Sequence, residues 1–156
     1  MDLTPIISEG LRVLPSYFGP DARSALELCP APDVYRRVFD ASVVDAARAA
    51  YTRLWTEIPN LPVPPIDTSP LVNAAMAEDF TVGGPRTRPF ANGYREIGAK
   101  LIPGVAWLVL RFVKPGSTIG LAFDGFVYLE PGNFAWFPKP WKMLAPAGAI
   151  WSHWSE

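Results

Sequence analysis

The sequence predicts an α+β fold, with N-terminal helices packed on a C-terminal antiparallel β-meander of four to five strands. Before Gly83, apolar residues recur at helical spacing, whereas short aromatic segments separated by Pro or Gly follow Tyr94. Segments that are neighbours along the chain and joined by short turns pair antiparallel. We expect one domain over residues 1–156, with a helical layer (1–84) and a sheet layer (85–156), because the helices have no other surface that would bury their apolar stripes.

The composition is that of a folded chain, since 49% of the residues are apolar and 13% aromatic. The 18 prolines indicate many short elements. Cys29 is the single cysteine, which excludes an intrachain disulfide and indicates a reducing compartment. The N-terminus lacks the features of a secretory signal, and the longest apolar run (105–110) is too short to span a membrane. We therefore expect a cytoplasmic protein with no membrane partner.

Charge is distributed unevenly along the chain. Residues 1–84 contain six basic and eleven acidic residues, whereas residues 85–156 contain eight basic and four acidic residues. Such an asymmetry indicates partners or ligands rather than a particular fold. The formal charge of −1 and the pI near 5.8 argue against nucleic acid as the main partner.

The predicted helices lie in the first layer. The first helix begins at Thr4, a capping residue ahead of Pro5, and ends before Pro15. A second, short helix is expected over residues 21–29, between prolines.

The clearest predicted helix begins near Ser42, where Asp45 three residues on resembles a capping box. Its apolar residues recur at helical spacing: Val44, Ala47, Tyr51, Leu54, Trp55 and Ile58. Residues 33–40 are expected to form either an earlier turn of this helix or a separate one. A proline-rich connector (59–65) and a further short helix (71–79) complete the layer.

The first predicted strand (104–113) is apolar on both faces, which is typical of the interior of a sheet, and Arg111 lies near its exit. Residues 114–117 predict a type II turn, with Pro and Gly at its centre. A second strand is expected over 118–123.

Asp124-Gly125 follows that strand and is a strong hairpin signal, because both turn positions favour a positive φ. Strands over 126–130 and 134–137, joined by a further turn at 131–133, would then complete the meander.

Small side chains mark one face of the second predicted strand, where Gly120 and Ala122 alternate with bulky apolar residues. The space that they leave would admit a ligand or, more commonly, a packed helix. The helix that contains Tyr51 is the expected occupant.

The loop that joins the two layers (85–95) is the first candidate site. Guanidinium groups hold a phosphate or carboxylate in bidentate fashion, and aromatic rings stack on a ligand ring. The candidate residues are Arg86, Arg88, Phe90, Tyr94 and Arg95. The alternative is a solvated connecting loop whose arginines pair with the acidic helices.

The proline-flanked segment 134–143 is the second candidate site. Its candidate residues are Trp136, Lys139, Trp141 and Lys142. Aromatic and basic side chains on one surface would bind a partner protein, a sugar or a single-stranded nucleic acid. The alternative is that the tryptophans cover the sheet as part of the core.

No catalytic set, metal site or cofactor is predicted. His153 is the single histidine, so histidine-rich metal sites are excluded, and nucleophilic Cys/His catalysis would require Cys29 to converge with it. Motifs for dinucleotide, phosphate-loop or zinc-protease chemistry are absent from the sequence. A paired-carboxylate enzyme would use two of Glu96, Asp124 and Glu130.

Three functions are compatible with these features, in this order. The first is a non-catalytic protein-binding module, such as an inhibitor or immunity protein that neutralises a toxin or enzyme through an aromatic and basic surface. The second is a domain that binds a small anionic ligand, a nucleotide or a sugar phosphate, through the loop 85–95. The third is an enzyme that uses carboxylates, or Tyr and Arg, as acid and base. The oligomeric state does not follow from the sequence.

Overall fold

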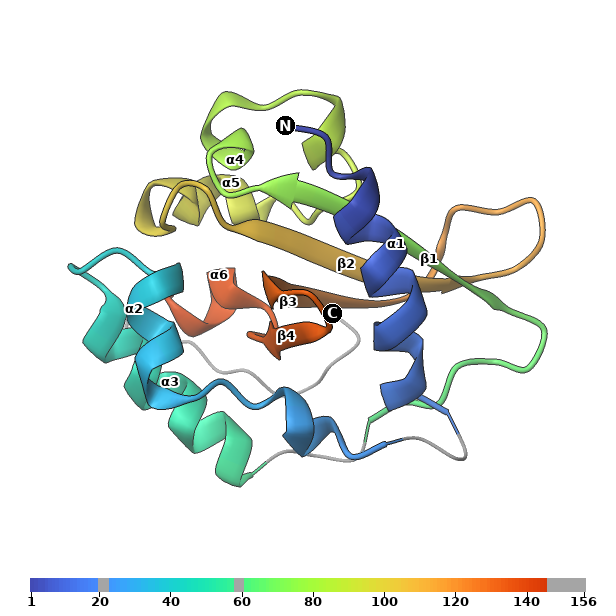
Figure 1. The fold of residues 1–156 in the computed structure, drawn as a ribbon, viewed down its shortest axis with the longest axis horizontal. Coiled ribbons are helices and arrows are strands. Elements are labelled where there is room, and N and C mark those ends of the chain that lie inside the picture. Colours follow the sequence, from blue (N-terminus) through green and yellow to red (C-terminus); the bar gives the residue numbers. More distant parts are fainter. Residues whose placement is uncertain (20–22, 58–60, 146–156) are drawn as a thin grey trace.

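A computed structural model of the chain contains a four-stranded antiparallel sheet with helices on both faces (Figure 1). It describes residues 1–19, 23–57 and 61–145. Each strand pairs with the next along the chain. The strands are β1 (Ser69–Met76), β2 (Ala106–Val113), β3 (Gly120–Glu130) and β4 (Asn133–Trp136). The predicted α+β class, with N-terminal helices and an antiparallel meander, is confirmed.

The helices are short, as the frequent prolines predict. In the described ranges the α-helices are α1 (Thr4–Val13), α2 (Tyr35–Val38), α3 (Val44–Thr56), α4 (Asp79–Val82), α5 (Gly93–Ile97) and α6 (Pro140–Met143). The 3₁₀ helices are η1 (Leu14–Tyr17), η2 (Ala25–Leu28), η3 (Pro32–Val34), η4 (Pro85–Thr87) and η5 (Gly98–Lys100). No helix in this part of the chain is long and apolar enough to cross a membrane.

α3 confirms the clearest predicted helix, although its start differs from the prediction. Its buried residues belong to the predicted apolar stripe: Ala47, Tyr51, Leu54 and Trp55. Ile58 lies outside the described residues. The expected capping box does not form, because the backbone N–H and the hydroxyl of Ser42 both donate to the Asp40 carboxylate, and no side chain caps α3. α2 is a separate helix rather than an earlier turn of α3.

β1 corrects the prediction of a helix over 71–79. Val72, Ala74 and Met76 are buried, while the alternate residues Leu71 and Asn73 are half-buried, which is the two-residue period of a strand. Leu, Ala and Met are good helix formers, but tertiary contacts override helix propensity, and pairing along the whole length of β2 outweighs that preference. The first part of the chain therefore supplies an edge strand as well as helices.

A bulge at Asp124-Gly125 corrects the predicted hairpin turn at this dipeptide. β3 continues through it, because Asp124 pairs with Val109 and Phe126 pairs with Leu108, which leaves Gly125 as an extra residue. Gly125 has φ +94°, and its carbonyl oxygen accepts a 2.7 Å hydrogen bond from the backbone N–H of Phe137. The bulge thus lets the chain beyond β4 dock against β3.

One face of the sheet is covered by α1, which packs on β1 and β2 (Figure 1). α1 approaches β2 closely at Gly10, where a Cβ would lie 2.7 Å from the side chain of Leu108. Phe18, just after η1, stacks on Phe123 with ring centroids 4.0 Å apart and meets Trp136 edge-on at 5.6 Å. This aromatic contact confirms that the N-terminal helical segment packs on the sheet.

The opposite face is covered only in part. Trp107 contacts the rings of Phe39 and Tyr94 at 6.2 and 5.9 Å, and Tyr51 contacts Phe137 at 5.3 Å. α3 packs mainly against α2 and α6, and the Tyr51 hydroxyl donates to the Pro138 carbonyl oxygen at 2.9 Å. α3 therefore does not occupy the space beside the small residues of β3, contrary to the expectation from the sequence.

Candidate functional site

A cavity of about 360 Å³ occupies the space beside the small residues of β3. Its floor includes Gly120 and Ala122 from β3 and Val109 and Arg111 from β2, and residues 88–91 form its roof. Asp124, Lys139 and Trp141 also line it. The volume lies in the usual range for small-molecule sites.

The register of β2 and β3 places the floor residues on one face. Val109 pairs with Asp124 and Arg111 pairs with Ala122, and residues paired directly across an antiparallel ladder point to the same side. Asp124 and Arg111 are therefore diagonal neighbours, at positions about 7–8 Å apart. The bulge at Gly125 re-aims the following residues, so that β3 continues into the core beyond this point.

Arg111 is held in place by the roof of the cavity. Its guanidinium donates a hydrogen bond to the carbonyl oxygen of Pro89, and the residue is half-buried. Burial lowers the pKa of the guanidinium, and the nearby Asp124 carboxylate opposes that change. Arginine stays protonated in proteins. Within the described residues the side chain forms no ion pair, so it presents a positioned positive charge.

Asp124 supplies the opposite charge in the same wall. Its Oδ1 accepts a hydrogen bond from the backbone N–H of Lys139 at 3.2 Å. Burial raises the pKa of the carboxyl to about 6, against the effects of that hydrogen bond and of the positive charges of Lys139, Arg111 and Lys142. The protonation of Asp124 consequently changes close to neutral pH.

Two buried tyrosines, Tyr51 and Tyr94, lie close enough to Asp124 to be affected by its charge. Burial, followed by the Asp124 charge, raises the pKa of both Tyr51 and Tyr94 well above the usual value. The ring of Tyr94 stacks on Phe80 at 4.7 Å and contacts Trp141 at 5.0 Å. The ring of Tyr94, which the sequence analysis predicted to stack on a ligand, therefore packs against other aromatic rings of the protein.

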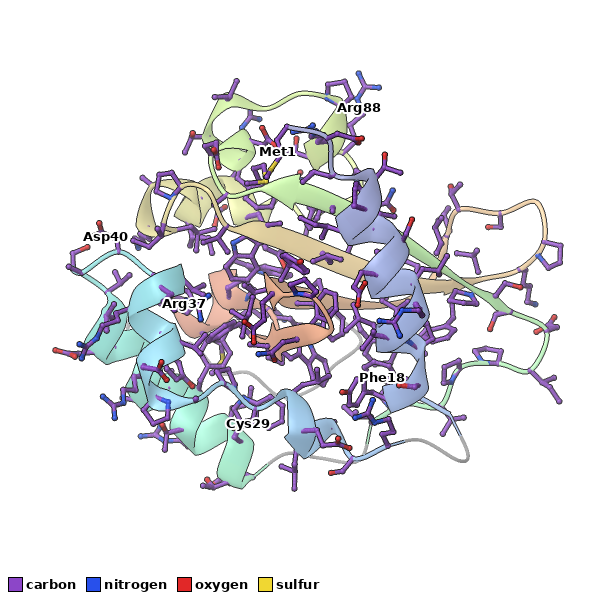
Figure 2. All side chains as sticks on the ribbon, viewed as in Figure 1. Met1, Phe18, Cys29, Arg37, Asp40 and Arg88 are labelled. Atoms are coloured by element: carbon purple, nitrogen blue, oxygen red, sulfur yellow. The ribbon has the colours of Figure 1, made fainter. Side chains whose placement is uncertain are left out.

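The predicted loop 85–95 lines a second cavity of about 310 Å³. Arg88, Phe90 and Ala91 line both cavities, so this short segment separates the two spaces. Figure 2 shows Arg88 at the edge of the molecule, on the same side as Met1. Phe90 is buried at 7% exposure, whereas Arg88 remains exposed.

The other two predicted arginines of this loop differ in their surroundings. Arg95 is exposed and lines the second cavity. Arg86 forms a 3.5 Å ion pair with Asp79 and donates to the Met1 carbonyl oxygen, and neither cavity includes it. Arg86 thus matches the alternative interpretation, in which a loop arginine pairs with an acidic residue.

The residues of the second predicted site, the aromatic and basic segment 134–143, lie partly in the core and partly along the first cavity. Trp136 is fully buried, stacks on Phe126 at 5.1 Å, and donates from its indole N–H to the Asp124 carbonyl oxygen at 2.8 Å. Lys139 is 5% exposed, at a left-handed φ of +47°. Trp141 and Lys142 are half-buried, and Trp141 lines the first cavity. Trp136 is therefore part of the core, as the alternative interpretation of this segment predicted.

The structure brings Arg88, Phe90, Lys139 and Trp141 from the two predicted segments to one cavity. Sequence reasoning missed Arg111 and Asp124 as members of this site. The signal for Arg111 was a guanidinium at the end of an otherwise apolar strand. Asp124 had been assigned to a turn, and only the bulge reveals its position in the wall.

Other chemistry receives no support from the described ranges. They contain no group of three or more His, Cys, Asp or Glu side chains arranged to hold a metal ion. Cys29 is an exposed residue, although partial burial of its thiol raises the pKa of that group. His153 lies outside the described residues. Comparisons with protein-family models, curated proteins and solved structures found no match for this chain.

Proposed function

We propose that the protein binds a small anionic ligand in the cavity above Gly120 and Ala122. The observation that supports this most directly is the half-buried guanidinium of Arg111, anchored on the Pro89 carbonyl oxygen with open space beside it. A positive charge in a partly dehydrated wall attracts an anion more strongly than the same charge in water. The planar guanidinium also has further N–H donors for a phosphate or carboxylate.

Two other basic residues increase the positive charge of this cavity. Arg88 lies at its exposed rim and Lys139 in its buried wall. Phe90, Val109 and Trp141 provide apolar surface beside them. Small-molecule sites are usually lined by apolar side chains with a few polar groups among them.

Binding to a partner protein stays a prediction that ranks second. A docking surface needs accessible aromatic and basic anchors. Trp136 and Lys139 are buried, which leaves Arg88, Arg95 and the half-buried Trp141 and Lys142 for such a surface. Of these residues, Arg88, Arg95 and Trp141 line cavities, and this favours a small ligand.

Arg111→Met should weaken anion binding at least tenfold, because the charge and its hydrogen bonds are lost while an unbranched apolar side chain is kept. Isothermal titration of inorganic phosphate, pyrophosphate, citrate and glucose 6-phosphate measures the affinities. A ligand that binds should also raise the melting temperature in proportion to RT ln(1 + [L]/Kd).

The matched control is Arg36→Met, because Arg36 is an exposed arginine on α2 and does not line the cavity. It should bind the same anions as the wild type. Unfolding curves of both variants separate a loss of binding from a loss of folding. The proposal fails if the wild type binds none of the anions, or if Arg111→Met binds them unchanged.

A further inference from the structure

We infer that the ligand is a hydroxylated anion of the sugar phosphate class, with its anionic group on Arg111 and its hydroxyl groups on Asp124. This inference rests on the proposed function and specifies its ligand. The cavity wall contains a carboxylate and a guanidinium at diagonal positions of β2 and β3. A ligand that fills the space between them must present acceptors at one end and donors at the other.

The side chains of Arg111 and Asp124 do not join each other across that space. In the part of the chain that the structure describes, Arg111 and Asp124 form no ion pair with each other. Arg111 instead donates to Pro89, and Asp124 accepts from the backbone of Lys139. A bidentate carboxylate has about four acceptor positions, so one hydrogen bond leaves Asp124 able to accept others. The wall is therefore complementary to a molecule that joins both groups.

A ligand that carries only negative charge fits this wall poorly. Its anionic group would be attracted to Arg111, but the remainder would lie against the Asp124 carboxylate, and like charges at short range repel in a half-buried site. A donor group must consequently face Asp124. A donor group of the ligand would stabilise the charged form of this carboxylate by a hydrogen bond.

That donor is better a hydroxyl than an ammonium group. Arg111 and Lys139 line the same cavity as Asp124, and together with Lys142 they lower the pKa of its carboxyl. An ammonium group beside the carboxylate would meet these three positive charges. A neutral hydroxyl donates the same hydrogen bond without that repulsion, which favours hydroxylated anions over amino acids.

The apolar part of the cavity suits a sugar. Trp141 lines the cavity next to Phe90 and Val109. Its indole packs directly against Gly93, where any Cβ would overlap the indole ring, so its position is set by the start of α5. The C–H face of a sugar can pack on an aromatic ring while the hydroxyl groups at its edge reach polar partners.

A matched pair of phosphate esters tests the requirement for hydroxyl groups. Glycerol 3-phosphate and propyl phosphate have the same chain length and charge, and only the first carries hydroxyl groups. At pH 8, where Asp124 is ionised, the wild type should bind glycerol 3-phosphate about tenfold or more tightly than propyl phosphate. Glucose 6-phosphate should also bind more tightly than glucose or inorganic phosphate.

Asp124→Asn is the decisive variant. The asparagine amide retains an acceptor for the Lys139 N–H, but the negative charge is removed. The preference for glycerol 3-phosphate over propyl phosphate should fall to less than threefold, while inorganic phosphate binds as well as before or better. Asp33→Asn, an exposed carboxylate in η3, is the control and should keep the wild-type preference.

The outcomes separate this inference from the proposed function. Equal affinity of the wild type for the two esters, or a preference that persists in Asp124→Asn, overturns the inference and leaves anion binding intact. Failure of every phosphate and carboxylate to bind the wild type overturns both. Unfolding curves at pH 8 confirm that each variant is folded before its affinity is interpreted.

Discussion

Gly125→Ala is expected to destabilise the protein by more than about 3 kcal/mol, because two separate costs add. The positive φ of +94° strains an alanine. A Cβ would also overlap the carbonyl oxygen of Phe137, and it would lie 2.6 Å from the carbonyl carbon. The chain beyond β4 would have to move, which breaks the hydrogen bond between Phe137 and Gly125. Urea denaturation with comparison of midpoints and slopes measures the loss.

Gly116→Ala is the matched control, since Gly116 also has a positive φ (+78°) but no atom lies within 4 Å of a Cβ placed there. Its cost should be only the conformational strain, about 1–2 kcal/mol. Equal destabilisation by the two substitutions would contradict the close approach of β3 and the segment after β4.

Asp124→Asn is expected to make the protein more stable than the wild type at pH 8, by about 2–3 kcal/mol. In the folded wild type the pKa of Asp124 is about 6, whereas the ordinary value is 3.8. Between these two values the folded state binds more protons than the unfolded state, so stability falls as the pH rises from about 4 to about 6 and stays reduced above it. Asparagine cannot ionise, and its variant therefore lacks this decline.

Denaturation of both proteins at pH 4, 6 and 8 measures the effect. Near pH 4 the two stabilities should converge, because the wild-type carboxyl is then protonated in the folded state. Other carboxylates, such as Asp2 and Asp40, whose pKa values are lowered by hydrogen bonds to Thr4 and Ser42, titrate in both proteins and cancel in the difference. A difference that is independent of pH would show that Asp124 ionises normally.

The class of the fold was predictable because its main signals are local. β2 is apolar on both faces, and this pattern alone indicates an interior strand between two neighbours. The turn at 114–117 likewise follows from Pro and Gly at its centre, and Gly116 has the positive φ that the turn requires. α3 follows from an apolar stripe with a helical period.

Where prediction failed, contacts distant in sequence outweighed a local preference. β1 has residues that favour a helix, yet it pairs with β2, and the paired residues lie 30 to 44 positions apart along the chain. Asp124-Gly125 is compatible with a hairpin turn and with a bulge, and the docking of Phe137 selects the bulge. Trp136 resembled an interface residue, but stacking on Phe126 places it in the core.

The candidate site was predictable only in part. Arg88 and Trp141 were identified because basic and aromatic residues cluster in two segments of the sequence, and both line the cavity. Arg111 was not, because it is a single charged residue near the end of an apolar strand, and Asp124 was not, because its dipeptide with Gly125 predicted a hairpin turn. Their shared role depends on strand register, and a shift of one residue would place them on opposite faces.

Helices followed by an antiparallel meander are predictable from the amino-acid sequence, since periodicity and turn residues act over a few positions. The sequence also indicated that small residues on β3 leave space on one face. That this space is a cavity and not a helix contact, and that a guanidinium and a carboxylate share its wall, depends on the packing of distant segments. The contacts that position them, from Arg111 to Pro89 and from Asp124 to Lys139, join residues far apart along the chain, and they form only when the whole core is packed.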